Sequence, residues 1–193
     1  MGTLRVSPSG TTPPADYQIA TTLDLRTDRR SAVTIQVGVA LTVAATIAVA
    51  LLLDLPLDSG WTPGVAAVVT VAAVVVYMVA HELTHGATLW SLTRVRPTYA
   101  VRLPYLTTGS QALLTRRHAV IVAMAPFVLW AVMLSALWLA LPQDALLTVY
   151  VLMALNVAGS VGDAVQAWAI SRLAPDSLVR DDGTETTVFL PSS

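Results

Sequence analysis

The amino-acid sequence predicts an all-α membrane protein with four transmembrane helices, both termini on the cytoplasmic side, and a small cytoplasmic β-layer or hairpins. Three observations predict this fold class. Hydrophobic residues make up 55% of the 193 residues and charged residues only 12%, about half the charged share of a typical soluble domain. Four apolar runs are each long enough to cross a bilayer. Every arginine lies outside these four runs.

Each apolar run exceeds the roughly 20 helical residues that a hydrocarbon core requires. The runs are Ser31–Leu53, Thr62–Leu89, His118–Leu141 and Ala145–Ser171. They predict one four-helix transmembrane domain over 31–171, between a cytoplasmic N-terminal segment, 1–30, and a cytoplasmic tail, 172–193. The polar stretch 1–30 lacks the apolar core of a cleavable signal, so the first run is expected to remain as an anchor.

The distribution of basic residues predicts the orientation. All eleven are arginine, and they fall within 1–30, 90–117 and 172–193, whereas the connections 54–61 and 142–144 carry only acidic charges. Segments rich in Lys and Arg stay on the cytoplasmic side, so the second and fourth helices are predicted to run parallel, from outside to inside. The use of arginine without lysine favours a GC-rich prokaryote and its plasma membrane. A net charge of −1 argues against a nucleic-acid partner.

Alternating side chains predict extended segments on the cytoplasmic side. Residues 95–103 alternate between apolar and polar or small side chains, and 107–110 are predicted to form a turn. In the tail, an Asp-Gly pair separates the β-prone runs 177–180 and 184–190, which is a hairpin signal. Residues 17–25 alternate weakly.

The second apolar run contains an HExxH motif. His81 and His85 are four positions apart, so a helix places both imidazoles on one face, with Glu82 beside them. This is the zincin arrangement, in which two His bind Zn²⁺ and the Glu acts as general base. Ionisable groups at membrane depth are costly and indicate function. The alternative is a polar cluster that joins helices or is solvated near the interface. Because the chain has no cysteine, no thiolate site is possible.

A catalytic zinc site usually has three protein ligands, and Asp163 is the only other acidic residue within a predicted span. His81 lies eighteen residues beyond Pro63, and Asp163 lies eighteen residues beyond Ala145. At the helical rise, both lie about 27 Å below the outer surface. Since the two helices are predicted to be parallel, Asp163 is predicted as the third ligand. The alternative is a helix end that reaches interfacial water.

Asn156 precedes Asp163 by seven residues, two helical turns, so both are predicted to face the same way. The glycines and serine within 159–162 would permit close helix approach or a local unwinding that aims the carboxylate. An interhelical hydrogen bond without chemistry is an alternative of equal weight for Asn156. Pro126 predicts a kink in the third helix, and His118 is interpreted as an interfacial residue.

The HELTHG sequence at 81–86, followed two spans later by NVAGSVGD at 156–163, resembles the putative zincin peptidases, a family of small four-helix membrane proteins distantly similar to site-2 intramembrane metalloproteases. The resemblance covers most of the chain, roughly residues 15–190. It implies that His81, His85 and Asp163 bind the metal, that Glu82 is the catalytic base, and that Asn156 matches an Asn of the site-2 proteases. The chain lacks their proline after that Asn and their LDG triplet, and it has no PDZ or CBS module.

The predicted function is a membrane-embedded zinc metalloprotease that hydrolyses peptide bonds near the cytoplasmic face. Zn²⁺ would be held by His81, His85 and Asp163; Glu82 would be the base, and Asn156 would orient Asp163 or contact an oxyanion. The partners would be the lipid bilayer and a membrane-protein or peptide substrate, paired with the extended segment near 95–103. A catalytically inactive metal-binding scaffold is the alternative. An ion pathway is disfavoured because no inverted repeat is visible.

Overall fold

A computed structural model of the protein describes residues 10–23, 28–102 and 105–192. Four helical segments in this part of the chain are long and apolar enough to cross a membrane. Three are single helices, and the fourth is divided in two. They are α1 (Arg29–Leu52), α2 (Pro63–Thr93), α3 (Arg116–Ala140), and α4 (Gln143–Gly159) followed by α5 (Val161–Ser171). The prediction of four long apolar helices is confirmed.

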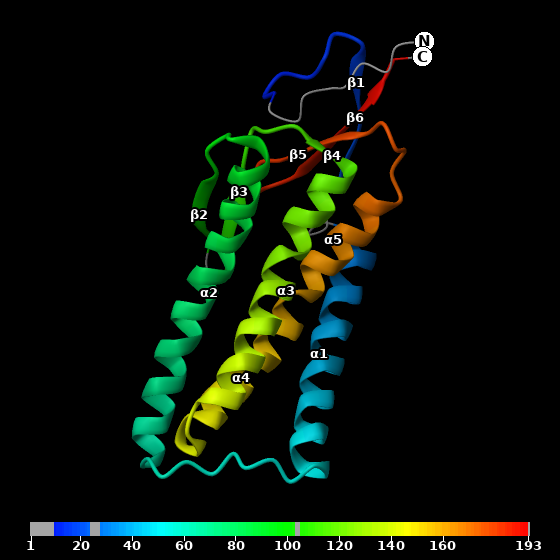
Figure 1. Ribbon diagram of the computed structural model, residues 1–193. Helices are drawn as coiled ribbons and strands as arrows, with labels where there is room; N and C mark the ends of the chain where they lie inside the picture. The colour runs from blue at the N-terminus through cyan, green and yellow to red at the C-terminus, as the bar shows by residue number, and fades with distance from the viewer. Residues whose placement is uncertain (1–9, 24–27, 103–104, 193) are drawn as a thin grey trace.

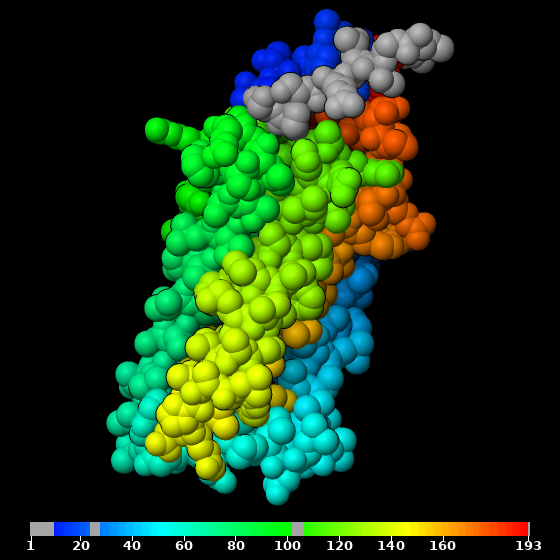
Figure 2. Space-filling model, in the orientation of Figure 1, coloured from blue at the N-terminus to red at the C-terminus, as the bar shows by residue number. Residues whose placement is uncertain are grey.

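The helices form an elongated bundle with the β-strands gathered at one end (Figure 1). Helix α3 contacts α2, α4 and α5, whereas α1 packs on the α4–α5 span. The connection 54–61 lies at the opposite end from β1 (Tyr17–Leu23), as the space-filling view also shows (Figure 2). At that end the Asp144 Oδ1 accepts a hydrogen bond from the Gly60 N–H at 2.6 Å.

Local signals set the ends of the helices. Asp28 caps α1 by accepting the Ser31 N–H at 2.8 Å, and this hydrogen bonding from Ser31 lowers the pKa of the Asp28 carboxyl. Pro63 occupies the first turn of α2, where its missing N–H costs no helical bond. Helix α2 continues beyond the predicted end and stops at Arg94, which adopts the left-handed conformation with φ of 61°.

The strands form two small antiparallel sheets at one end of the bundle. One has the order β1-β6-β5-β4 and the other pairs β2 with β3. The remaining bounds are β2 (Thr98–Arg102), β3 (Tyr105–Gly109), β4 (Leu114–Thr115), β5 (Leu178–Asp181) and β6 (Thr186–Pro191). The tail hairpin predicted from the Asp-Gly pair is confirmed: β5 pairs with β6, and Gly183 has φ of +85°, which only glycine adopts freely.

The predicted turn at 107–110 is wrong. Thr107 and Thr108 lie within β3, paired with Ala100 and Tyr99 of β2. Threonine is β-branched and favours strands, and its pairing with β2 outweighs the turn signal of the following Gly109. The link between the two strands falls at 103–104, outside the described residues.

Two glycines allow the hairpins to approach the helices and each other. A Cβ atom on Gly109 would lie 2.1 Å from the carbonyl oxygen of Asp182, in the β5–β6 turn. A Cβ atom on Gly86 of α2 would overlap the Tyr99 side chain of β2. The Ser110 N–H also donates to the Asp181 carbonyl at 2.7 Å. These contacts hold the β2–β3 and β5–β6 hairpins against each other at the C-terminal end of α2.

Candidate metal centre

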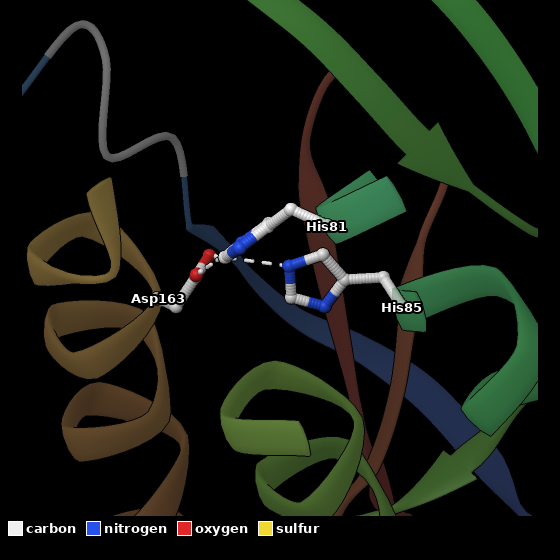
Figure 3. A group of neighbouring side chains, drawn as sticks. All are labelled: His81, His85 and Asp163. Atoms are coloured by element: carbon white, nitrogen blue, oxygen red, sulfur yellow. Dashed lines mark hydrogen bonds and ion pairs between the residues drawn. The ribbon is translucent and has the colours of Figure 1, made fainter. Parts of the chain in front are cut away.

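Three metal-ligating side chains face one another between α2 and α5 (Figure 3). His81 and His85 lie one turn apart on α2, and Asp163 lies in the first turn of α5. The His81 Nε2 is 3.3 Å from one carboxylate oxygen of Asp163, and the His85 Nε2 is 3.6 Å from the other. The three side chains are largely buried, with exposed fractions of 12%, 12% and 21% respectively.

The break in the fourth span delivers Asp163 to this position. Helix α4 ends at Gly159, Ser160 has φ of −79° and ψ of 0°, and α5 begins at Val161. Asp163 is therefore a first-turn residue of α5, where the partial positive charge of a helix N-terminus favours a carboxylate. This interruption falls within 159–162, where the small residues permit a local unwinding of the helix.

These residues fit a zinc ion. Zinc binds imidazole nitrogen and carboxylate oxygen at about 2.0–2.2 Å in tetrahedral geometry, which separates neighbouring donor atoms by about 3.3 Å. The two nitrogen–oxygen distances of 3.3 and 3.6 Å are close to that value. One ligand atom from each of the three residues lies within 4.8 Å of the other two. Two imidazoles and one carboxylate also match the donor set of catalytic zinc sites.

A chain of hydrogen bonds orients His81. The Asn156 Nδ2 donates to the Phe127 carbonyl at 3.1 Å, so the Asn156 Oδ1 is turned to accept from the Tyr77 hydroxyl at 2.8 Å. The Tyr77 oxygen lies 3.2 Å from the His81 Nδ1. Because the Tyr77 hydroxyl donates its proton to Asn156, the Tyr77 oxygen can only accept from His81, so Nδ1 of His81 is the donor. In the neutral imidazole the lone pair is then on Nε2, which is directed at Asp163.

His85 is oriented by the backbone of α3. Its Nδ1 lies 2.9 Å from the carbonyl oxygen of Val122. A carbonyl only accepts hydrogen bonds, so Nδ1 carries a proton, and in the neutral imidazole Nε2 keeps its lone pair. Metal-binding histidines in proteins are typically held by such a partner on the second ring nitrogen. Both imidazoles therefore present Nε2 to the same point.

Glu82 lies beside the three donor residues and borders a cavity of about 240 Å³. Its Oε2 accepts a hydrogen bond from the Thr108 hydroxyl of β3 at 2.8 Å. The cavity also borders His85 and Asp163, and its far walls are formed by β3 and the β5–β6 turn. A space of this size, shared by a carboxylate and by two metal donors, can admit water and part of a ligand.

The predicted site residues fall into two groups. The structure brings His81, His85 and Asp163 together, with Glu82 at the adjoining cavity. Asn156 is fully buried and contacts Tyr77 and the Phe127 carbonyl; its predicted role at Asp163 or an oxyanion stays a prediction.

Three residues that the sequence did not indicate also contribute. Tyr77 and Thr108 contact the side chains of His81 and Glu82, and the Val122 carbonyl accepts from His85. The position of Tyr77, four residues before His81 on the same helical face, was a usable signal. The other two contacts depend on tertiary structure.

Comparison with known proteins gives one family match. Residues 74–178 match the family model described as putative zincin peptidase. The matched segment is more than half of the 193 residues, and it includes the two histidines and Asp163. No significant match was found to a curated protein or to a solved structure.

Proposed function

The chain belongs to the putative zincin peptidase family, and from this premise we propose that it is a membrane-embedded zinc metalloprotease. Its reaction is the hydrolysis of peptide bonds near the cytoplasmic face of the membrane. The observation that carries the proposal is the group formed by His81, His85 and Asp163 beside Glu82 and an adjoining cavity. This combination of three zinc donors with a neighbouring carboxylate is the one that metal-assisted hydrolysis uses.

The membrane assignment is supported by the surface of the helices. Helix α1 has no buried residue, and large apolar side chains such as Leu41 and Val68 are 66% and 70% exposed. A surface of this kind is suited to lipid rather than water. The arginines that flank the helices all lie at the end of the bundle where the β-strands are gathered. Arg94 after α2 and Arg116 at the start of α3 are examples. The positive-inside rule then assigns this end to the cytoplasm.

Glu82 is the general base of the proposed reaction. When bound, Zn²⁺ supplies Lewis acidity that activates water and polarises a carbonyl. The Thr108 hydroxyl holds Oε2 of Glu82, which leaves Oε1 to accept the proton of the attacking water. The same carboxyl then delivers this proton to the amide nitrogen of the leaving group. The water oxygen bonds to the carbonyl carbon and becomes part of the new carboxyl group, while the C–N bond breaks and the amine leaves with the transferred proton.

An extended peptide or unwound segment of a membrane protein is the proposed substrate. Strand β3 borders the cavity through Leu106, Thr107 and Thr108, and its only strand partner among the described residues is β2. The free edge of β3 offers backbone groups to a substrate strand. Pairing there would hold the substrate backbone beside Glu82, since Thr108 already contacts that side chain.

The test compares the Glu82→Gln variant with the wild type. We expect Glu82→Gln to retain about one zinc per chain and to abolish cleavage, because the amide cannot accept the water proton. The uncleaved substrate should then be recovered with the variant from membranes and identified by mass spectrometry. Asp176→Asn is the control, since Asp176 is an exposed carboxyl that does not border the cavity. Absence of zinc from the purified wild type, or an identical membrane proteome for Glu82→Gln, would overturn the proposal; zinc without any cleavage would favour a metal-binding scaffold.

A further inference from the structure

The proline inside α3 leaves one backbone carbonyl without its helical partner. Pro126 is buried within α3, and proline has no N–H to donate to the carbonyl four residues earlier. That carbonyl belongs to Val122. A buried carbonyl deprived of its partner is costly and is normally satisfied by another donor. The donor that contacts the Val122 carbonyl is the Nδ1–H of His85, at 2.9 Å.

We propose that Pro126 is a positioning residue for the metal centre. By removing the competing helical N–H, it reserves the Val122 carbonyl for His85 and fixes His85 as the Nδ1–H tautomer. The Nε2 lone pair of His85 then points to Asp163, whose Oδ1 is 3.6 Å away. The proposal rests on the zinc site of the proposed function, but it does not depend on cleavage.

Burial makes this arrangement consequential. The His85 side chain is only 12% exposed, and the Val122 carbonyl is the acceptor that the fold supplies to its Nδ1. In the opposite tautomer the lone pair of Nδ1 would face the lone pairs of the Val122 carbonyl, and the proton on Nε2 would block the metal-binding position. An imidazole in that state would have to lose its Nε2 proton, and reverse its hydrogen bonding, before it could bind zinc.

The same helix also serves the other histidine. The chain from His81 through Tyr77 and Asn156 ends on the carbonyl of Phe127, the residue directly after Pro126. Both imidazoles on α2 are therefore oriented by backbone carbonyls of α3, one four residues before the proline and the other directly after it. His85 contacts the Val122 carbonyl, which Pro126 frees, without an intermediary. His81 is connected to the Phe127 carbonyl only through the side chains of Tyr77 and Asn156.

The tautomer can be measured directly. The chain has three histidines. In ¹⁵N-histidine-labelled, metal-free protein in detergent, NMR therefore records the ring-nitrogen chemical shifts of three imidazoles, which single substitutions assign. At a pH high enough for the imidazoles to be neutral, wild-type His85 should show a protonated Nδ1, which donates to the Val122 carbonyl, and an unprotonated Nε2. A predominantly Nε2–H imidazole at His85 in the wild type would overturn the proposal without any variant.

Two variants test the role of the proline. Pro126→Ala restores the helical N–H, and Pro126→Ser adds a hydroxyl that can also donate to the carbonyl four residues earlier. We expect a mixed tautomer population at His85 in both, and zinc affinity about 10–100-fold weaker, as for loss of an outer partner of a ligand, with Ser at least as affected as Ala. Affinity is measured by competition with a chromophoric chelator, and thermal unfolding identifies which variants are folded.

Pro63→Ala is the matched control, because Pro63 lies in the first turn of α2 and deprives no helical carbonyl. It should leave the His85 tautomer and the zinc affinity unchanged. If folded Pro126→Ala and Pro126→Ser both keep the wild-type tautomer and affinity, the proposal fails. Neither readout involves proteolysis, so a protein that holds zinc and cleaves nothing would refute the proposed function alone.

Discussion

The Nε2 of His81 lies 3.3 Å from the Oδ2 of Asp163, although the two residues are 82 positions apart in the sequence. This contact joins the second and fourth apolar segments at the level of the HExxH motif. It requires both helices to end at the same side of the bundle, and it requires the break that starts α5 at Val161. The candidate metal centre therefore depends on two spans and cannot be formed by α2 alone.

Replacing Asp163 with asparagine should severely weaken zinc binding. The substitution preserves the shape of the side chain but removes the anionic ligand between His81 and His85. The loss in affinity should exceed the roughly 10–100-fold expected when only an outer partner of a ligand is removed. Zinc content and chelator competition are the measurements, and exposed Asp176→Asn is the control that should retain wild-type binding. Equal zinc content in Asp163→Asn would show that Asp163 is not a ligand.

Removing the hydroxyl of Tyr77 should weaken the site without touching a ligand. In Tyr77→Phe, the Nδ1–H of His81 loses its acceptor and Asn156 loses its donor. We expect zinc affinity about 10–100-fold lower. Tyr150→Phe is a matched control, since its hydroxyl donates to the Thr46 carbonyl, away from the site. If both variants bind zinc as the wild type does, the hydrogen-bond chain has no role in holding the metal.

The parts of the fold that the sequence predicted are those governed by local patterns. Length and apolarity indicate the spans, and the Asp-Gly pair indicates the β5–β6 hairpin, because these signals act over a few neighbouring residues. The pairing of Asp163 with the HExxH histidines was also predictable, since parallel helices with a fixed rise place equal residue counts at equal depth. Helical geometry alone was enough for that step.

The contacts that the sequence did not predict are tertiary. Thr108 was assigned to a turn because of the glycine that follows it, whereas pairing with β2 makes it part of β3 and brings it to Glu82. Asn156 was expected to act with Asp163 because a continuous helix would align them. The interruption at Ser160 lies between them, and the described hydrogen bonds of Asn156 go to α2 and α3, as the alternative of an interhelical hydrogen bond predicts, while a role at Asp163 stays a prediction. Nothing in the local sequence specifies those partners.

Thr108→Val should impair cleavage while zinc binding persists. The substitution keeps the β-branched shape that suits β3 but removes the hydrogen bond to the Glu82 carboxylate. A hydrogen bond to a charged group contributes about 1.5–3 kcal/mol, so the rate should fall about tenfold or more on the substrate captured with Glu82→Gln. Thr108→Ser keeps the hydroxyl and should recover much of the rate. A Val variant as fast as wild type would mean that Thr108 does not hold the base.

Gly109→Ala should separate the two hairpins that wall the cavity. Its Cβ atom would strike backbone atoms of Asp182 at 2.1 and 2.2 Å, which cannot move aside as a flexible side chain can. Overpacking typically costs about 1–3 kcal/mol, so thermal unfolding should occur earlier and proteolysis within 178–191 should accelerate. Gly64→Ala is the control, because nothing lies within 4 Å of the new atom. Indistinguishable stability of Gly109→Ala and Gly64→Ala would contradict this view of the interface.

The proposed orientation can be tested because the chain has no cysteine. Single cysteines at the exposed positions Asp58 and Ser192 mark the two ends of the bundle. In intact cells, a membrane-impermeant maleimide should label Asp58→Cys, whereas Ser192→Cys should react only after lysis. The reverse pattern would place the β-layer outside and would contradict a cytoplasmic site.

The interruption of the fourth span at Ser160 divides it into two arms with different attachments. Asn156 anchors the α4 arm to Tyr77, while the α5 arm carries Asp163 and is tied to the β-layer through Gln166, whose Nε2 donates to the Asp181 carboxylate at 2.5 Å. The β5–β6 hairpin is therefore connected to Asp163 by way of α5. One donor of the candidate metal centre thus lies on the helix to which the strands outside the bundle are hydrogen-bonded.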